Sequence, residues 1–370
     1  MASTAGAPLR ALSPCVAKDV DSGGSNGEKR QVNESVMAVS GKDQRPLAGR
    51  SAWIFTTWAA GMDAQTRGVG DALGLDYQMK PIHPQGVFKL LAPWGPVAPS
   101  ERFGKMGSVF APPWPEVAIA LGRSAVPYLR ALRRSSPDTF TLQMLDTRAG
   151  RRVADVIWVP QHDRLRGPNV ITTPTAPHSF TAERLARLRL ELPADIAALP
   201  QPRIAVILGG KNKVYEFRPA DDARFAASLR ALGALGASFM ITPSRRTHAR
   251  LLEVTEEATR AFPRILWNGE GANPYPQFLA QADALVVTAD SVNMTGEAAA
   301  TGRPVYVFTP SAGSGKFSRF HAALQGHGAT RPLPDHPEAM PAWTYEPLQS
   351  AETIAREIER RWNARRGIGR

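Results

Sequence analysis

The stretch ALVVTADSVNMTGEAAATGRPVYVF, from Ala284 to Phe308, decides the fold of this chain. It predicts a buried strand over residues 284–288, a polar turn over 289–293, a short helix of small residues, a stop at Thr301–Gly302 and a second strand over 304–308. Strand, helix and strand in this order form a βαβ unit. Other parts of the chain repeat the alternation of strand and helix signals, which predicts an α/β fold with parallel sheets.

The polar turn of this unit is a candidate binding site. The carboxyl ends of parallel strands and the positive N-terminus of the following helix together form an anion site. Asp290, Ser291 and Asn293 can cap the helix, and their backbone amides then point at a ligand. Glu297 follows about one turn into the helix, where its carboxylate can chelate a vicinal diol. A phosphate on the helix end and a carboxylate on a ribose are the contacts that a nucleotide-sugar donor needs; a surface glutamate that only complements the helix dipole is the alternative.

Length and composition set the broad class. At 370 residues and 43% hydrophobic content, the chain is long enough for two domains. It contains no apolar run of the roughly 18 to 20 residues that cross a bilayer, and its first residues lack the apolar region of a secretory signal. A single cysteine, Cys15, excludes an internal disulfide framework and cysteine-rich metal sites. We therefore expect a cytoplasmic protein.

The formal net charge of +12 favours anionic partners such as phosphates, nucleic acid or an acidic membrane surface. An arginine-rich solvated surface is the plainer explanation. From Pro81 to Pro115 the sequence is dense in Pro, Gly and Trp, which indicates loops that can pack against a cleft or a membrane face. Residues 116–134 predict an apolar start followed by a basic helix, which can either dock on anionic lipid or remain solvated.

Four segments are expected along the chain. Residues 1–49 are rich in Ser, Gly and scattered charge, so we expect a disordered extension. Residues 50–198 and 199–345 each carry alternating strand and helix signals, which indicates two α/β domains. Residues 346–370 form a C-terminal helix and a basic tail, whose basic end we expect to be solvated.

Two further loops of the second domain follow directly on predicted strands. The first comes after the strand over 203–208 and the second after the strand over 238–242. Glycines give flexible backbone and cations attract phosphate, so both loops are candidates for the diphosphate, although a structural turn would also use Gly-Gly. The candidates are Gly209, Gly210 and Lys213 in the first loop and Ser244, Arg245 and Arg246 in the second.

The loop over residues 268–275 is a candidate for the nucleobase, since Trp267 and Tyr275 can flank a ring, and we include Asn273 and Tyr275 in the site. A plain aromatic-lined turn is the alternative.

Two glycine-rich stretches resemble nucleotide-binding motifs only superficially. Residues 68–74 have the wrong spacing for a dinucleotide fingerprint, and residues 311–317 lack the first glycine and the hydroxyl of a Walker loop, although Lys316 remains a candidate at the cleft.

Taken together, several motifs resemble the mitochondrial fission protein family, also described as the elongated mitochondria family. They are HDRLRGPNV at 162–170, PSRRT at 243–247, ANPY at 272–275, VTADSVNMTGEAAATGRPVYV at 287–307 and GKFSRFH at 315–321. The resemblance covers roughly residues 50–365. It implies the bacterial glycosyltransferase branch with a GT-B-like fold, in which two Rossmann-like doubly wound parallel-sheet domains face a cleft. It further implies a donor site in the second domain, with Glu297 on the ribose, and an acceptor side in the first.

The sequence departs from the family in its first loop. The family motif reads like DGKPGHENQ, whereas this chain has TWAAGMDAQ at residues 57–65, so that the histidine is replaced by Met62. A general base need only reach the acceptor hydroxyl. We expect Asp63 or His162 to act in its place.

The resulting hypothesis is a hexosyltransferase-like glycosyltransferase that is metal-independent and has no cofactor besides its donor substrate. The donor is a nucleoside diphosphate sugar, the acceptor is unknown and envelope-related, and no nucleic acid is expected. The protein would be cytoplasmic and peripheral on the inner face of the membrane. A non-catalytic GT-B-shaped adaptor is the alternative, as the family name implies, and a nucleotide-sugar epimerase would need a dinucleotide fingerprint that the sequence lacks.

Overall fold

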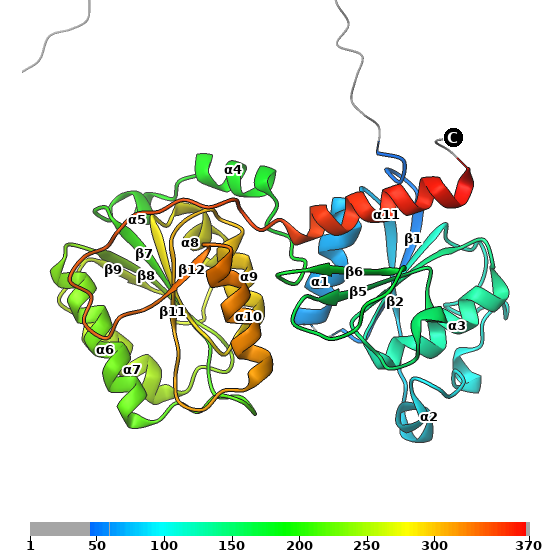
Figure 1. The fold of residues 1–370 in the computed structure, drawn as a ribbon, viewed down its shortest axis with the longest axis horizontal. Helices are drawn as coiled ribbons and strands as arrows, with labels where there is room; N and C mark the ends of the chain where they lie inside the picture. Colours follow the sequence, from blue (N-terminus) through cyan, green and yellow to red (C-terminus); the bar gives the residue numbers. More distant parts are fainter. Residues whose placement is uncertain (1–44, 59, 368–370) are drawn as a thin grey trace, which may run out of the picture. The chain divides into compact units, whose positions relative to one another are not determined.

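The computed structural model describes residues 45–58 and 60–367, and the expectations for residues 1–44 and 368–370 lie outside this part of the chain. Two six-stranded sheets organise it, and every strand pairing within them is parallel. We call the parts built around these sheets the first half and the second half (Figure 1).

The first sheet has the strand order β2-β1-β3-β4-β5-β6. Its strands over 117–121, 140–144 and 156–160 are buried throughout, as expected where helices cover both faces of a parallel sheet. The strands are β1 (Ser51–Thr56), β2 (Asp76–Pro81), β3 (Val117–Leu121), β4 (Phe140–Met144), β5 (Val156–Pro160) and β6 (Val170–Thr173). The connecting helices are α1 (Ala60–Ala72), α2 (Gly86–Leu91) and α3 (Val126–Ser135), with single 3-10 turns at Pro99–Glu101, Arg123–Ala125 and Arg151–Val153.

The second sheet has the order β12-β11-β10-β7-β8-β9. Its strands are β7 (Arg203–Leu208), β8 (Ser238–Pro243), β9 (Arg264–Leu266), β10 (Ala284–Thr288), β11 (Val305–Phe308) and β12 (Thr330–Pro332). Its helices are α4 (Ala182–Leu190), α5 (Ala194–Ala197), α6 (Pro219–Ala234), α7 (Ala249–Thr259), α8 (Tyr275–Gln281), α9 (Val292–Ala299) and α10 (Gly315–Gly326). The chain closes with α11 (Ser350–Arg366).

The predicted fold of two doubly wound parallel sheets is confirmed. The opening βαβ unit is β10, α9 and β11, at the predicted positions to within a residue or two. In the second sheet the chain winds outward from β7 in one direction through β8 and β9, and from β10 in the other through β11 and β12. The carboxyl ends of β7 and β10 therefore flank a topological switch point, which is where ligands bind in open sheets of this kind.

The structure differs from the expected organisation in three places. Leu47, expected in the extension, is fully buried in the core of the first half. Residues 180–198, assigned to the first domain by sequence, pack instead in the core of the second half through Phe180, Leu185 and Ile196. The apolar start of the 116–134 stretch is strand β3, and the helix begins only at Val126, because Gly122 adopts a positive φ that ends the strand.

Helix α11 packs on the first half, so its basic end is not simply solvated. Ile354, Ile358 and Trp362 lie in the first core, and the Trp362 ring meets Phe140 edge-on at a centroid distance of 5.6 Å. At its end, Arg365 pairs with Asp155 at 3.3 Å. Figure 1 shows α11 lying alongside the first sheet. The chain thus leaves the first half after β6, builds the second half, and returns to complete the first.

The glycines of the 68–74 stretch have a packing role. A Cβ at Gly68 would come within 2.8 Å of the His178 backbone, and one at Gly70 would press on the Tyr77 ring. Both positions lie on α1, ten or more residues beyond the end of β1. They let the helix approach its neighbours closely, which explains the glycine run without a dinucleotide.

Candidate functional site

The candidate site lies at the carboxyl edge of the second sheet, where the loops after β7, β8 and β10 meet. The Asn212 side chain donates to the Asp290 carbonyl at 3.1 Å, which joins the first loop to the third. The Thr247 hydroxyl donates to the carbonyls of Leu208 and Gly209 at 3.0 and 2.6 Å, which joins the second loop to the first. The three predicted loops are therefore one connected structure.

Asp290 holds this structure together. Its side chain is fully buried and accepts hydrogen bonds from the Gly210 amide at 2.9 Å and the Thr288 hydroxyl at 2.6 Å. Burial raises the pKa of Asp290, although these hydrogen bonds and the charge of Arg246 act in the opposite direction. Arg246 pairs with the carboxylate at 3.0 Å. Asp290 was expected to cap α9, but its carboxylate is turned into the loops instead.

Gly209 and Gly210 are required by this arrangement. A Cβ at Gly209 would overlap the Asp290 carboxylate, and one at Gly210 would overlap the backbone carbonyl of Arg246. Both glycines are buried. The Gly-Gly pair therefore brings two neighbouring loops into contact, and this packing role stands beside the phosphate role expected from the sequence.

Helix α9 presents its N-terminus at this edge. Ser291 is the N-cap, and its hydroxyl accepts the Met294 amide at 3.4 Å. Among the described residues, we find no acceptor for the amides of Val292 and Asn293. An N-terminus with free amides carries a partial positive charge and suits an anion. The Asn293 side chain accepts from Gln65 at 3.4 Å and is partly exposed.

Glu297 lies one turn further along α9 and faces Tyr275, whose hydroxyl donates to its Oε2 atom. Burial raises the pKa of Glu297 to about 7, while the hydrogen bond from Tyr275 and the charge of Arg184 act in the opposite direction. The pKa of Tyr275 is also raised, by burial and by the neighbouring carboxylate. Two oxygens of one acid, one of them held by a tyrosine, form a fixed acceptor of the kind that a vicinal diol can use.

The cations at this edge fall into two groups. Lys213 and Arg245 are exposed, and neither has an acidic partner within ion-pair distance in the described part of the chain. Arg246 and Lys316 are engaged, Arg246 with Asp290 and Lys316 with Asp163 at 2.7 Å. Lys213 and Arg245 can therefore bind a phosphate without first breaking an ion pair. Arg246 primarily balances the buried charge of Asp290. Ser244 accepts the Arg246 amide at 3.2 Å and so shapes the second loop.

His162 lines a cavity of about 300 Å³ together with Gln65, Asn293, Lys316 and several apolar side chains. Burial lowers the pKa of His162, and the charge of Lys316 acts in the same direction, so the ring is neutral at pH 7. Its Nδ1 atom is buried and has no hydrogen-bond partner. A neutral imidazole has one ring nitrogen that can accept a proton.

The other candidates have plainer surroundings. The Asp63 carboxylate accepts the hydroxyl of Thr56 at the end of β1, so part of its acceptor capacity is used within the first half. Asn273 is exposed, and its side chain accepts the Tyr275 amide at 3.0 Å, which starts α8. Trp267 donates to the Glu270 carbonyl at 2.8 Å. These contacts are those of an ordered turn.

Thr288 is a member of the site that the sequence did not suggest, and Thr247, which lies in the predicted second loop, was given no role of its own. Besides donating to Asp290, the Thr288 hydroxyl accepts the Gly209 amide at 2.8 Å. The available signal was a hydroxyl residue at the end of an apolar strand, directly before the polar turn.

Two general properties complete the description. Within residues 45–58 and 60–367, no cluster of three or more His, Cys, Asp or Glu side chains is placed to hold a metal ion. Across the same residues, no helix combines the length and apolar character that crossing a bilayer requires.

Comparison with known proteins gives a consistent family assignment. A family model described as mitochondrial fission ELM1 matches residues 60–362. Mitochondrial fission protein ELM1 of Arabidopsis thaliana is 29% identical over 276 residues, which cover 68% of this chain and 65% of that protein. Uncharacterized protein RP120 of Rickettsia prowazekii (strain Madrid E) is 30% identical over 204 residues, covering 54% and 57%. The matches thus span less than two thirds of these curated relatives.

Among solved structures, the UDP-GlcNAc 2-epimerase of Methanocaldococcus jannaschii aligns with a TM-score of 0.46 and 10% identity, over 83% of this chain and 98% of that one.

Proposed function

We propose that this chain, which belongs to the mitochondrial fission ELM1 family, binds a nucleoside diphosphate sugar at the carboxyl edge of its second sheet and transfers the sugar to an acceptor. The observation that supports this most is the position of two unpaired cations, Lys213 and Arg245, in the loops that meet the free amide end of α9. Glu297 lies one turn along the same helix.

Each group has a definite part in this proposal. The diphosphate would accept hydrogen bonds from the amides of Val292 and Asn293 and charge-assisted bonds from Lys213 and Arg245. The Glu297 carboxylate would accept the ribose hydroxyls. As the bond between sugar and diphosphate breaks, negative charge grows on the leaving phosphate, and fixed positive groups beside it lower the barrier. This electrostatic term is the main source of catalysis in our proposal, without a divalent ion.

His162 is the proposed general base. His162 lines the cavity beside Asn293, where its ring would take the proton from the acceptor hydroxyl, and its neutral state at pH 7 is the one that a base needs. Asp63 is the second candidate, and its bond with Thr56 already occupies part of its acceptor capacity. The acceptor and the cytoplasmic location are part of the same proposal, whereas an association with the inner membrane face is proposed independently of the transfer reaction.

Thermal unfolding with a panel of nucleoside diphosphates tests the binding step. A ligand at one hundred times its dissociation constant stabilises the folded state by about 2.7 kcal/mol, so at least one nucleotide should raise the melting temperature by several degrees. Glu297→Ala should reduce that ligand-induced shift, measured against the variant's own unliganded melting temperature. Glu253→Ala is the matched control, because Glu253 is an exposed acid on α7 without an ion-pair partner in the described chain. If no nucleotide raises the wild-type melting temperature, the enzyme proposal fails.

A non-catalytic adaptor is the second proposal, and the membership of the fission family favours it. It predicts no thermal response to any nucleotide. A chelator also separates mechanisms within the first proposal: activity that EDTA abolishes and magnesium or manganese restores would contradict transfer without a metal.

A further inference from the structure

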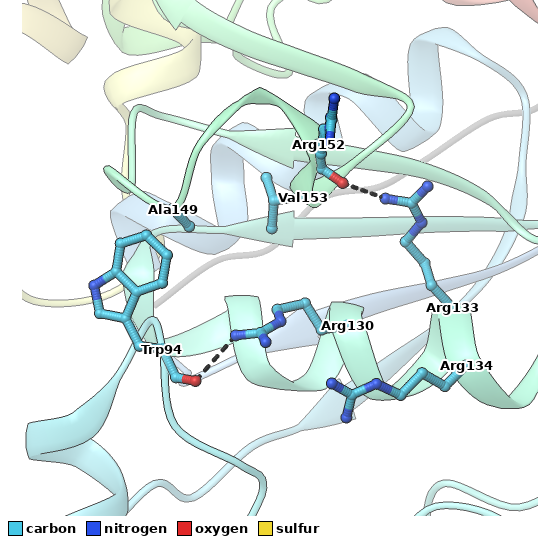
Figure 2. Close-up of a pocket in the computed structure, with 7 residues that line it drawn as sticks. All are labelled: Trp94, Arg130, Arg133, Arg134, Ala149, Arg152 and Val153. Carbon is cyan, nitrogen blue, oxygen red and sulfur yellow. Dashed lines mark hydrogen bonds between the residues drawn. The ribbon is translucent and has the colours of Figure 1, made fainter.

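We infer that one face of the first half docks on an anionic lipid bilayer. We call it the basic-apolar face and define it by Leu90, Leu91, Trp94, Arg102, Arg134 and Arg152, which α2, the segment after it, α3 and the turn at Arg151–Val153 supply. Trp94, Arg134 and Arg152 line one hollow of about 470 Å³ (Figure 2). Trp94, Arg102 and Arg134 line a second of about 440 Å³. This inference does not depend on the nucleotide site, which belongs to the second sheet.

The apolar part of the face is unusually exposed. Leu90 is 78% exposed, Trp94 63% and Leu91 47%, and these large side chains follow one another within five residues. Helix α2 buries none of its residues, and Figure 1 shows it projecting away from the first sheet. Contiguous exposed apolar side chains of this size indicate an interaction site.

Contacts with the core of the first half and with α3 hold the region around these side chains in place. The rings of Phe103 and Phe110 stack at 4.7 Å in the first half's core, and Trp114 packs edge-on against Trp53. Arg130 donates to the Trp94 carbonyl at 3.0 Å, which ties the segment to α3 (Figure 2). On the inner side Trp53 and Phe110 are thus buried and Phe103 and Trp114 partly buried, while Leu90, Leu91 and Trp94 remain outside.

The same region concentrates positive charge. Residues 86–152 contain ten Lys and Arg against four Asp and Glu, an excess of six that equals half of the whole chain's net +12. Glu101 is the sole acid between residues 82 and 115 of the sequence. It is turned inward, accepting the Tyr128 hydroxyl and the His83 amide. No acidic group of that segment therefore offsets the cations of the face.

The arginines divide into those that hold the structure and those that are free. Arg133 donates to the Arg152 carbonyl at 2.7 Å and faces Asp155, so it is structural. In the described part of the chain, Arg102, Arg134 and Arg152 have no acidic partner within ion-pair distance and are exposed. Figure 2 shows the Arg134 side chain lying apart from the two bonded arginines.

A bilayer surface fits this combination better than a soluble anion does. Tryptophan and leucine side chains enter the region of headgroups and upper acyl chains, and cations beside them attract anionic headgroups. A free phosphate would use the arginines but leave the three apolar side chains in water. Each Lys or Arg near an anionic surface contributes about 1 kcal/mol, or roughly five-fold in partitioning.

Vesicle flotation with the full chain tests the inference. The probes are vesicles of pure phosphatidylcholine and vesicles with 30% phosphatidylserine. We expect binding to the anionic vesicles that falls as salt is raised, and little binding to the neutral ones. Arg134→Gln with Arg152→Gln should lower the partition coefficient by roughly twenty-five-fold, and Leu90→Gln with Trp94→Gln should lower it at any salt concentration.

The matched control is Arg230→Gln with Leu190→Gln, an exposed arginine and an 87% exposed leucine of the second half. It should bind as the wild type does, and thermal unfolding should show all variants folded. Equal binding to both vesicle types, no binding to either, or an equal loss in the control pair would each overturn the inference. Nucleotide-induced stabilisation should be unchanged in the arginine variant. A loss of vesicle binding can therefore be distinguished from a failure of the proposed nucleotide-sugar function.

Discussion

At the scale of single residues, the site contains two acids whose pKa burial raises, and they differ in the partners that the protein gives them. Asp290 is matched by Arg246 and by donors from Gly210 and Thr288, and it serves the folded structure. Glu297 has one protein donor, Tyr275, and a pKa raised to about 7. An acid that is held at some cost and only partly satisfied is better explained by a ligand than by stability.

Glu297→Gln should therefore stabilise the unliganded protein above neutral pH. The folded-state pKa of about 7 lies above the unfolded value near 4.3, so the folded state holds the proton more tightly, and the free energy of unfolding falls as pH rises between these values. A neutral glutamine avoids this loss. We expect a gain of up to about 3 kcal/mol at pH 8 in urea titrations that vanishes near pH 4. A variant that is less stable at pH 8 would show that the carboxylate supports the fold.

Arg246 and Arg245 should separate stability from binding, although they are adjacent. Arg246→Gln leaves the buried Asp290 without its counter-charge and should cost about 1–3 kcal/mol at pH 7. The pKa of Asp290 is already raised and would rise further, so the folded state binds the proton more readily and the cost should shrink as pH is lowered towards 5. Arg245→Gln should leave the melting temperature unchanged at either pH and weaken nucleoside diphosphate binding. The reverse pattern would contradict the roles given to them.

At the scale of elements, the second half was largely predictable. The strands over 203–208, 238–242 and 284–288 were located from continuous apolar runs bounded by turns, and all three lie where expected. Strand β3 was missed because the apolar run of Val117–Leu121 leads within a few residues into a helix, and periodicity alone does not separate the two.

The site was predictable as a set of loops but not as a set of roles. Parallel-sheet geometry requires strand-end loops to share an edge, so Gly209, Ser244 and Asp290 could be grouped from sequence. The ion pair between Arg246 and Asp290 joins positions 44 residues apart in sequence. Either side chain could equally have faced a ligand, and only the packing of the loops decides which one does.

The contact between the loops after β7 and β8 should be sensitive to a single methyl group. Gly210→Ala would drive a Cβ into the Arg246 carbonyl, and neither backbone segment can yield without breaking hydrogen bonds. We expect a loss of at least 3 kcal/mol in urea unfolding, or a failure to fold. Gly326→Ala is the control, since the space around this α10 residue is open and alanine favours helix, so that variant should be neutral or slightly stabilised.

At the scale of the whole molecule, the first half is built from both ends of the described chain. Leu47 and Trp362 lie in the same core although more than 300 residues separate them in sequence. Because β6 and α11 border the intervening segment, the second half is in effect an insertion within the first. A boundary drawn from sequence alone misses this relation, since α11 reads as an ordinary terminal helix.

Trp362→Ala should destabilise the first half specifically. The ring is 2% exposed and packs against Phe140, so its removal should cost about 3–5 kcal/mol. Hydrogen exchange would locate the effect: amides of β1, β3 and β4 should exchange faster, while those of β7 and β10 keep their protection. Arg356→Ala, on the exposed side of the same helix, should change neither. Uniform loss of protection in both sheets would indicate a single cooperative unit.

The return of α11 also has a consequence for biosynthesis. A ribosome emits β1 to β6 first, yet the apolar side of that sheet receives Ile354, Ile358 and Trp362 only after the whole second half has been translated. At about 5 to 20 residues per second, the earlier part waits roughly ten seconds or more with its core open. The part made later can therefore finish folding first, and nascent chains halted before residue 350 should be the ones that chaperones retain.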